Sequence, residues 1–519
     1  MKLKDVLADS DTDLYFDEKG KFIPERLGQE IMQIADFVTM RDTGEVYCYD
    51  KSGIYQPTGE VFIREAVTEI LGEKANRHYG DEVVYYIRTK TGRDREELIV
   101  PLNIIPLDNG VFNIETGEME NYSPSLFFTS KHPVHYDPDA KCPSIDKFLS
   151  EIVATDEEVI LLKEAVAYCF YRSYLIQKSF MLIGEGGNGK SVYLALTKSM
   201  LGAHNTTSVN LQDLETNRFA SSYLYERHAN KYPDISANAL YGTGKFKMLT
   251  GGDQIAAERK FGHSFNFVNY AKLLFSCNIM PITHDDTGAF YRRWVIVKFP
   301  FSFEDRGDPN LLGRLTTASE LSGFFNELVP ILKDLLERGA FSYHKTAEEI
   351  KEEYTRLSDT VGSFALDRIE ISTEEYISKD DLYNSYCDFC RTEKLISVAK
   401  SEFSKRLPRY VNVEDYRPKV DNRQIRSWKG IRLKENSQDS QGSQDVSHLK
   451  YTEKITIENK VEKTLTMATT LTTKEGICTL CKKPSVIVGN RMLEDGVLKK
   501  QVKFELCAEC FDDSNQKRE

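Results

Sequence analysis

The spacing of apolar residues divides the first third of the chain into two parts. Between residues 31 and 135 short runs such as "EVYCYD", "EVVYYIRT" and "ELIVPLNIIPLDNG" are rich in β-branched and aromatic residues, and Asn109-Gly110 is a turn signal. These features predict strands joined by turns. Between residues 144 and 178 apolar positions recur at spacings of three and four, which predicts helix.

A different pattern runs from Ser179 to about Pro300. Three apolar runs, "SFMLIG", "AKLLFSCN" and "WVIVKFP", alternate there with segments of helical spacing. Such alternation is typical of a nucleotide-binding layer, so we predict an α/β fold for the core of the chain. Residues 310–358 again have helical spacing, and residues 360–434 form a small mixed unit.

The pattern of apolar positions ends at residue 435. The segment "ENSQDSQGSQDVSH" is too polar to bury a core, and the Thr-rich stretch 452–473 is either extended or disordered. The expected order is a polar tip (1–30), an N-terminal domain (31–150) and a nucleotide-binding core (151–345). A small mixed domain (346–434), a flexible linker (435–474) and a cysteine unit (475–519) are expected to follow.

Composition narrows the class of protein. The 519 residues include 68 Lys and Arg against 80 Asp and Glu, a net charge of −12, so any contact with nucleic acid must be local. No run of about 18 apolar residues occurs and acids follow the first residues, which argues against a membrane span and a secretory signal. Ten cysteines in a chain of this length favour a reducing, cytoplasmic location over a disulfide framework.

The passage "SFMLIGEGGNGKSVYLAL" fits the phosphate-binding pattern G-x(4)-G-K-[ST] between a strand and a helix. Glycines let backbone N–H groups curl around a phosphate, and the helix N-terminus adds its dipole. Lys190 is expected to reach the β- and γ-phosphates, and the Ser191 hydroxyl to bind Mg²⁺. ATP and Mg²⁺ are therefore the expected cofactors. The predicted nucleotide-binding residues are Gly184, Gly186, Gly187, Asn188, Gly189, Lys190 and Ser191.

The residues after this loop carry further motifs. The blocks "TGGD…KF…F.F…KLLFS.N..P" and "RRW" resemble those of superfamily 3 helicases, specifically the helicase half of the phage and plasmid primase–helicase family, which includes the poxvirus primase–helicase. The resemblance covers about residues 30–435. It implies an AAA+-type P-loop ATPase core, a mixed α+β N-terminal collar domain that precedes it, and a C-terminal winged helix.

The resemblance assigns catalytic roles beyond Lys190. Asp234 corresponds to an acid that orders Mg²⁺ and its water shell, although an Asp before a helix is also a common cap. Asn278 corresponds to a polar sensor that holds the attacking water or the γ-phosphate. Residues 229–233 depart from the plain apolar strand usual before this acid, and no second acid sits beside it. The general base therefore stays open between Asp234, Asp253 and Glu258.

Arg292 and Arg293 precede the last apolar run. A guanidinium keeps its proton and forks onto phosphate oxygens, so it can stabilise charge at the transition state. In ring ATPases such an arginine reaches into the neighbouring subunit's site, which implies a homo-oligomer, with a hexamer expected. Either arginine fits this role, and an ordinary surface pair is the alternative.

The block "GGDQIAAERKFGHSF" corresponds to a hairpin that points into the ring channel in this family. Arg259, Lys260 and His263 would supply charge for a phosphate backbone, and Phe261 could stack on a base. Lys260 is the first candidate for the residue that grips the strand. The alternative is a hairpin that only shapes the subunit contact.

Residues 400–434 contain eleven Lys and Arg but only four Asp and Glu. "KSEFSKRLPRY" is predicted to form a basic recognition-type helix with Lys405 and Arg406 as DNA contacts, and "YRPKVDNRQIRSWKGIRLK" to form the wing of a winged helix. Tyr416 and Trp428 lie among these charges, as suits a DNA backbone. A solvated charged face is the alternative.

Two C-x(2)-C pairs lie near the end of the chain. Four thiolates at this spacing suit tetrahedral zinc, and the unit has too little core to fold without a metal. We predict a closed, structural zinc ribbon with "VLKKQVK" as its middle strand; a redox pair is the alternative. Cys387 and Cys390 lack a second pair nearby and are expected to be core and surface residues rather than metal ligands. The predicted Zn²⁺ ligands are Cys478, Cys481, Cys507 and Cys510.

These features predict an ATP-dependent replicative DNA helicase of a plasmid, virus or integrated element, a ring that moves 3′ to 5′ on one strand. Its expected partners are single-stranded and forked DNA, other copies of itself and a separate primase or polymerase, in the host cytoplasm if the chain is viral. The alternative is an ATP-switched initiator that binds an origin without processive unwinding; a packaging motor fits the hairpin block less well. Asp9, Asp11 and Asp13 sit in a polar tip, so no primase activity is expected.

Overall fold

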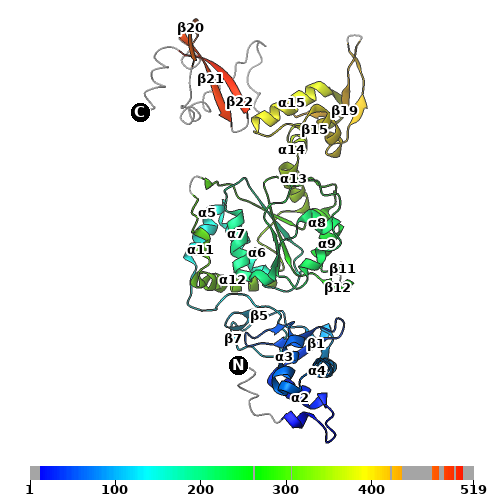
Figure 1. Cartoon of the computed structure of the whole chain (residues 1–519). Coiled ribbons are helices and arrows are strands. Elements are labelled where there is room, and N and C mark those ends of the chain that lie inside the picture. Colours follow the sequence, from blue (N-terminus) through cyan, green and yellow to red (C-terminus); the bar gives the residue numbers. More distant parts are fainter. Residues whose placement is uncertain are drawn as a thin grey trace. The chain divides into compact units, whose positions relative to one another are not determined.

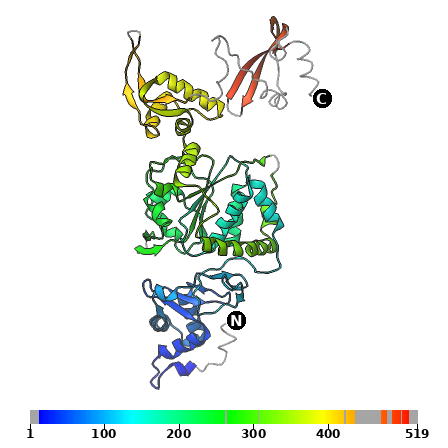
Figure 2. The same cartoon turned by 180° about the vertical axis from the view of Figure 1, so that it is seen from behind.

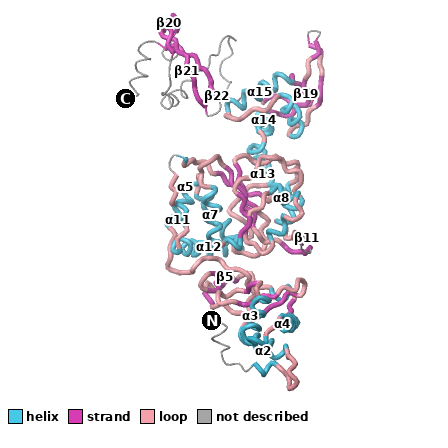
Figure 3. The backbone as a smooth tube through the Cα atoms, in the orientation of Figure 1, coloured by secondary structure: helices cyan, strands magenta, loops and turns pink. Residues whose placement is uncertain are grey.

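The computed structural model describes residues 12–260, 264–304, 307–420 and 423–434, and the backbone of three strands between residues 470 and 506. The chain divides into two units, Met1–Lys434 and Glu435–Glu519 (Figure 1). Figure 2 gives the view from behind, and Figure 3 separates helices from strands by colour. Among the described residues, no helix has the length and apolar content needed to cross a membrane.

The N-terminal part packs three helices against a small sheet. Leu27, Ile63 and Val83 from the three helices meet in one buried cluster. The sheet has the order β3-β2-β1-β4, in which only β4 runs parallel to its neighbour. Its elements are η1 (Thr12–Tyr15), α2 (Pro24–Ile34), β1 (Phe37–Met40), β2 (Val46–Tyr49), β3 (Tyr55–Gln56), α3 (Gly59–Leu71), η2 (Gly72–Lys74), α4 (Arg77–Lys90), β4 (Gly92–Arg93) and η3 (Arg95–Leu98).

The run "EVVYYIRT" belongs to helix α4, so its prediction as a strand is wrong. Val83, Val84 and Ile87 are buried at helical spacing, whereas Tyr85 between them is 74% exposed. The Asn76 side chain caps the helix by accepting a hydrogen bond from a backbone N–H of the first turn. This cap and the one-sided burial outweigh the strand preference of the β-branched and aromatic residues.

A three-stranded meander follows, with the order β5-β6-β7. Leu107 pairs with Gly110, so Asp108 and Asn109 form a two-residue hairpin turn beside the predicted turn signal. The strands are β5 (Ile104–Leu107), β6 (Gly110–Asn113) and β7 (Met119–Glu120).

Five parallel strands form the central sheet of the core, in the order β14-β8-β13-β10-β9. The three predicted apolar runs are β8, β13 and β14. The stretch Ala229–Tyr232 is also a strand of this sheet and pairs with β13 and β9. The Asn230 amide bonds to both backbone groups of Val209, at 2.7 and 3.0 Å. The elements are α5 (Pro143–Ile152), α6 (Asp156–Cys169), β8 (Ser179–Ile183), α7 (Lys190–Leu201), η4 (Ala203–Asn205), β9 (Thr206–Thr207), α8 (Leu211–Thr216), η5 (Ala220–Leu224), β10 (Ala229–Tyr232), α9 (Gly244–Leu249), β11 (Gln254–Glu258), β12 (Ser264–Val268), β13 (Lys272–Cys277), α10 (Gly288–Tyr291) and β14 (Trp294–Lys298).

Alternate residues of β8 enter two different cores. Phe180 and Leu182 pack with α5, α6, α7 and the later helix α12 (Ala318–Arg338). Met181 and Ile183 pack with α8, α9 and the later helix α13 (Ala347–Ser358). Side chains of a strand point to opposite faces in turn, and a parallel sheet is covered on both faces. Figure 1 shows α6 and α7 on one side of the sheet and α8 and α9 on the other.

The helices predicted for residues 310–358 are present, and a smaller mixed part follows them. Its sheet has the order β15-β19-β16, and Trp428 of β19 is 6% exposed within its core. Cys390 is buried and Cys387 partly exposed in α15, as expected. The elements are α11 (Leu311–Leu315), α12 (Ala318–Arg338), α13 (Ala347–Ser358), α14 (Thr360–Arg368), β15 (Ile369–Ser378), α15 (Lys379–Thr392), α16 (Lys400–Arg406), η7 (Leu407–Arg409), β16 (Glu414–Tyr416), β17 (Lys419–Val420), β18 (Arg423–Gln424) and β19 (Ser427–Leu433).

The second unit contains an antiparallel sheet of the order β20-β21-β22, with bounds Thr470–Ile477, Pro484–Asp495 and Leu498–Leu506. The basic run predicted as the middle strand lies in β22, at the edge, because the long strand β21 pairs with both others. The four cysteines predicted to bind zinc lie outside the described residues.

Candidate nucleotide-binding site

The loop between β8 and α7 is held in a shape that requires glycine. Gly187 and Gly189 have φ angles of 66° and 88°, in the left-handed region. A Cβ at Gly189 would lie 2.7 Å from Ile152 Cγ2, and one at Gly187 would overlap the side chain of Glu304. The loop therefore adopts its curl because no side chain stands in the way.

Lys190 is the first residue of α7 and is only 6% exposed. Its ammonium donates to the backbone oxygens of Gly184 and Glu185, the latter at 2.9 Å. It also donates to the side-chain oxygens of Asn188 at 3.1 Å and Asn278 at 3.4 Å. Burial lowers the pKa of Lys190, although the neighbouring Cys277 and Asp234 raise it. The cation thus lies at the N-terminus of a 12-residue helix, where anions bind.

Ser191, Asp234 and Asn278 line the same cleft as Lys190, with a volume of about 600 Å³. Ser191 follows Lys190 in α7, Asp234 lies just beyond β10, and Asn278 directly follows β13. Because β13 lies between β8 and β10, the C-terminal ends of three parallel strands meet here. A hydroxyl and a carboxylate oxygen are ligands that Mg²⁺ accepts. The structure therefore brings the predicted phosphate and metal residues together.

The cleft also contains residues that the sequence analysis missed. Phe148 and Ile152 of α5 form an apolar wall, and Glu304 lies against the glycine loop. Arg314 of α11 lines the cleft and forms an ion pair with Asp308. None of these residues belongs to a recognisable motif, so only their packing around the loop identifies them.

Neither Asp253 nor Glu258 lines this cleft. Glu258 lies 3.4 Å from Arg218 Nε in an ion pair, and both acids belong to the segment around the β11–β12 hairpin. They are therefore poor candidates for a base that acts on nucleotide in their own subunit. Among the described residues, the acids that line the cleft are Glu151, Glu185, Asp234, Glu304 and Asp308.

The two arginines of "RRW" have different surroundings. Arg293 is 7% exposed, and its Nε donates to Thr250 Oγ1 at 2.9 Å. Arg292 is exposed, and its Nη2 donates to Gln177 Oε1 at 2.9 Å. Burial lowers the pKa of Arg293, as does the neighbouring charge of Arg292. Arg292 is thus available at the surface, whereas Arg293 is part of the internal structure.

Both arginines lie at the end of the sheet opposite to the cleft. Trp294, which follows them, pairs with Ser179 at the start of β8, and Lys298 pairs with Ile183 at its end. Five extended residues span roughly 16 Å, which is further than an arginine side chain reaches. Arg292 therefore cannot contact a nucleotide held by the glycine loop of its own subunit.

The predicted hairpin is present as the antiparallel pair β11–β12. Arg259 and Lys260 lie beyond the end of β11 and are exposed. The Arg259 guanidinium lies 5.3 Å from the ring centre of Phe265 and 5.8 Å from that of Tyr225. Phe261 and His263 lie outside the described residues.

In the basic C-terminal part, some of the predicted DNA contacts are exposed and others are engaged or buried within the protein. Lys405 and Tyr416 are exposed. Arg406 is engaged within the protein, with its guanidinium 2.9 Å from Glu402 and 3.4 Å from the buried Asp359, which argues against the predicted DNA contact. Trp428 is a core residue rather than a DNA-facing one, as its burial shows.

Among the described residues, Cys142, Asp146 and Glu327 lie close enough together to hold a metal. The Lys163 ammonium already lies 2.7 Å from Asp146 and 2.6 Å from Glu327. This cluster is therefore best explained as a salt bridge.

Three family profiles match successive parts of the chain. Residues 8–154 match the family described as D5 N terminal like, and residues 356–455 match the family described as Poxvirus D5 protein-like. Residues 182–293, which include the glycine loop and the arginine pair, match DUF5906, a family of unknown function.

Similar proteins are found among viruses and among solved structures. A curated protein of Acanthamoeba polyphaga mimivirus that is described as a helicase is 26% identical over 212 residues, which make up 38% of this chain and 22% of that protein. The chain thus spans about a fifth of the length of that relative. Two structures of the NrS-1 C-terminal region cover 78% of this chain and 99% of their own, with 12% and 11% identity and TM-scores of 0.46 and 0.45.

Along the chain, D5-type sequence lies on both sides of residues 182–293, and the motifs in that stretch are those expected of superfamily 3. Together these matches support a phage or viral superfamily 3 primase–helicase-like protein.

Proposed function

We propose that this chain is an ATP-driven replicative DNA helicase that works as a ring and moves 3′ to 5′ along one strand. The observation that supports this best is the division of the ATPase residues between two ends of one sheet. Lys190, Asp234 and Asn278 share a cleft at the C-terminal end, while Arg292 is exposed at the N-terminal end. A complete site then requires two copies of the chain.

Each residue of the cleft has a role that follows from its position. Lys190, at the start of α7, binds the β- and γ-phosphates. Ser191 and Asp234 would hold Mg²⁺, which neutralises charge on the phosphates when bound. The Asn278 amide lies beside Lys190 and orients the attacking water without adding charge. Arg292 of a neighbouring copy stabilises the negative charge of the transition state.

The β11–β12 hairpin supplies the contact with the translocated strand. Arg259 and Lys260 are exposed beyond β11, and the predicted contacts Phe261 and His263 follow them in the sequence. In the C-terminal part, α16 and the strands β16 and β19 would form a winged helix that binds duplex DNA, with Lys405 and Tyr416 among its contacts. Cations on exposed loops bind the phosphate backbone of any sequence.

The cysteine unit would be a structural zinc ribbon. Ile477, which precedes the first cysteine pair, lies opposite Pro484, and Leu506, which precedes the second pair, lies opposite Ile487. Both pairs therefore follow strands that end at the same end of the sheet, as a shared zinc ion requires. Metal analysis of the full chain should find one zinc per chain, and none after replacement of Cys507 and Cys510 by Ser.

Strand displacement on forked DNA tests the main proposal. Wild-type protein should unwind a substrate with a 3′ tail, in the presence of ATP, and leave a substrate with only a 5′ tail paired. Lys190→Ala should bind DNA without unwinding it. If the wild type binds DNA and hydrolyses ATP but separates neither substrate, the chain is instead an ATP-switched origin-binding initiator.

A further inference from the structure

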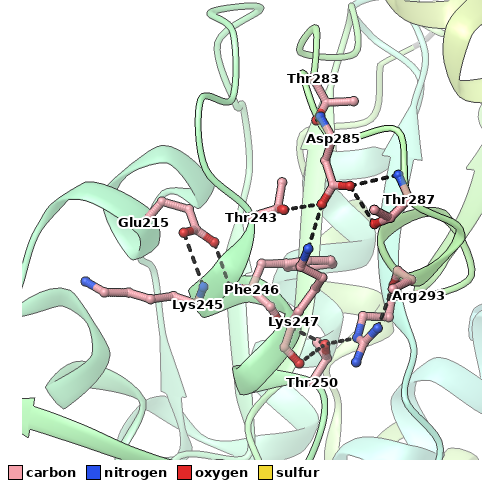
Figure 4. Close-up of polar contacts among 11 residues, drawn as sticks. Glu215, Thr243, Lys245, Phe246, Lys247, Thr250, Thr283, Asp285, Thr287 and Arg293 are labelled. Carbon is pink, nitrogen blue, oxygen red and sulfur yellow. Dashed lines mark hydrogen bonds and ion pairs between the residues drawn. The ribbon is translucent and has the colours of Figure 1, made fainter.

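The short helix α9 directly precedes the β11–β12 hairpin in the chain, and side-chain contacts connect it to the segment after Asn278 and to the arginine pair. At one side the Lys247 ammonium lies 2.8 Å from Asp285 Oδ2, and the Thr243 hydroxyl donates to the same carboxylate (Figure 4). Asp285 belongs to the segment that leaves the sheet through Asn278. The sensor segment is therefore fixed to α9.

At its other side α9 is bonded to the arginine pair. Thr250, which follows α9, accepts the hydrogen bond from Arg293, as Figure 4 shows. The next residue, Gly251, accepts from Gln177 Nε2 at 3.2 Å, and the Oε1 atom of Gln177 accepts from Arg292. The root of the hairpin is thus connected to both arginines, to the exposed one through Gln177.

Two further contacts keep α9 rigid. Glu215 caps its first turn by accepting from the backbone N–H groups of Lys245 and Phe246, at 3.2 and 2.7 Å. The Phe246 ring stacks on Trp294 of β14, with 4.7 Å between ring centres. A capped, packed helix shifts as a unit instead of unwinding, so a displacement at one end reaches the other.

We infer that α9 transmits the nucleotide state from the Asn278 segment to the hairpin, and that Lys247 and Asp285 are the positioning residues of this connection. This inference rests on the proposed function and deepens it. Neither residue touches the cleft, so they act only through the elements they join.

The ion pair is suited to such a role. The side chains of Lys247 and Asp285 are 30% and 10% exposed, so solvent screens their attraction less than on an open surface. Burial raises the pKa of Asp285, but hydrogen bonds from Lys247, Thr243 and Thr287 outweigh it and hold the pKa well below its usual value. The carboxylate therefore stays charged throughout the neutral range.

Nucleotide-dependent DNA binding tests this connection in the full chain. The affinity for a fluorescent single strand is measured with ADP and with a non-hydrolysable ATP analogue, and the ratio of the two gives the coupling. We expect Lys247→Met and Asp285→Ala to reduce a coupling ratio of about fivefold or more to near one. Lys247→Arg should keep the ratio, because it keeps the charge. Lys245→Met is the matched control, since that side chain lies on the same helix and bonds elsewhere.

A fold that is merely destabilised would lower the binding-competent fraction in both nucleotides and leave the ratio unchanged. If the wild type shows coupling and Lys247→Met keeps it, the inference is overturned while the proposed function stands. If the wild type unwinds no DNA but its coupling disappears in Lys247→Met, the inference stands and the helicase proposal fails. A wild type with equal affinity in both nucleotides overturns the inference.

Discussion

The two ends of the parallel sheet are built in opposite ways. At the C-terminal end, glycines and exposed side chains leave a cleft of about 600 Å³ around Lys190. At the N-terminal end, Arg293 is buried against Thr250, and Lys272 is fully buried at the start of β13. One end is open, with the predicted phosphate-binding residues around a cleft, and the other is packed, with Arg292 exposed on its surface.

In the function proposed above, this difference explains how one chain would contain all parts of an ATPase site and still need a neighbour. The strands fix the separation between the ends, so the arginine and the cleft of one subunit cannot meet. They can meet between copies arranged head to tail, which is the geometry of a closed ring.

Loss of Arg292 should have the largest effect. Arg292→Ala is expected to lower the rate of ATP hydrolysis about 10³-fold, because an arginine acting in trans contributes that much or more. The measurement is steady-state hydrolysis in the presence of single-stranded DNA. Mixing Arg292→Ala with Lys190→Ala should restore part of the rate, since an intact cleft can then face an intact arginine. Full ATPase activity of Arg292→Ala would contradict the proposal that Arg292 completes the cleft of a neighbouring copy.

Loss of Lys190 should impair ATP hydrolysis at the open end of the sheet without destabilising the packed end. Lys190→Ala is expected to reduce hydrolysis about 10²- to 10³-fold, as for other groups that stabilise developing charge. The thermal midpoint should stay near that of the wild type, because the ammonium contacts only loop groups. Lys198→Ala, in the last turn of the same helix, is the control and should hydrolyse ATP normally. Equal loss in both variants would show a general effect on α7.

Loss of Arg293 should destabilise the packed end of the sheet. Arg293→Met removes a buried guanidinium and leaves Thr250 without its donor, so the free energy of unfolding should fall by about 1–3 kcal/mol. Arg292→Met should leave stability nearly unchanged, since that side chain is exposed. Denaturant unfolding of the two variants measures the difference. If Arg292→Met were the less stable variant, Arg292 would be the structural residue and Arg293 the available one.

The smallest effect concerns the buried Lys272. Burial lowers its pKa to about 7, although its ammonium donates to the backbone oxygens of Tyr171 and Tyr270. Above that pH the folded chain has released a proton that the unfolded chain still binds up to the usual lysine pKa. The free energy of unfolding should therefore rise with pH in this window, by at most about 1.4 kcal/mol per pH unit.

The comparison of wild type with Lys272→Met isolates this contribution, because other groups titrate equally in both. Unfolding measured between pH 6.5 and 9 should show the wild type gaining stability relative to the variant. Parallel pH profiles would mean that Lys272 keeps its proton in the folded protein.

Parts of the fold and site were predictable because their signals are local. The glycine loop at residues 184–191 and the apolar runs of β8, β13 and β14 follow from neighbouring residues along the chain. Helix α4 was missed because its composition favours strand, while the burial of Val83 and Ile87 depends on helices elsewhere in the N-terminal part. The same holds for Ala229–Tyr232, where the Asn230 amide finds its partner at Val209.

The sequence by itself determined the glycine-rich loop, the alternating core and the arginine pair, because each is encoded in a few adjacent residues. Only the tertiary structure decided that Arg292 is exposed and Arg293 buried, that both lie at the far end of the sheet, and that α9 joins the sensor segment to the hairpin. Those properties depend on the parallel register of β14 with β8 and on contacts between residues more than 35 positions apart, such as Lys247 with Asp285 and Thr250 with Arg293. No local pattern contains that information.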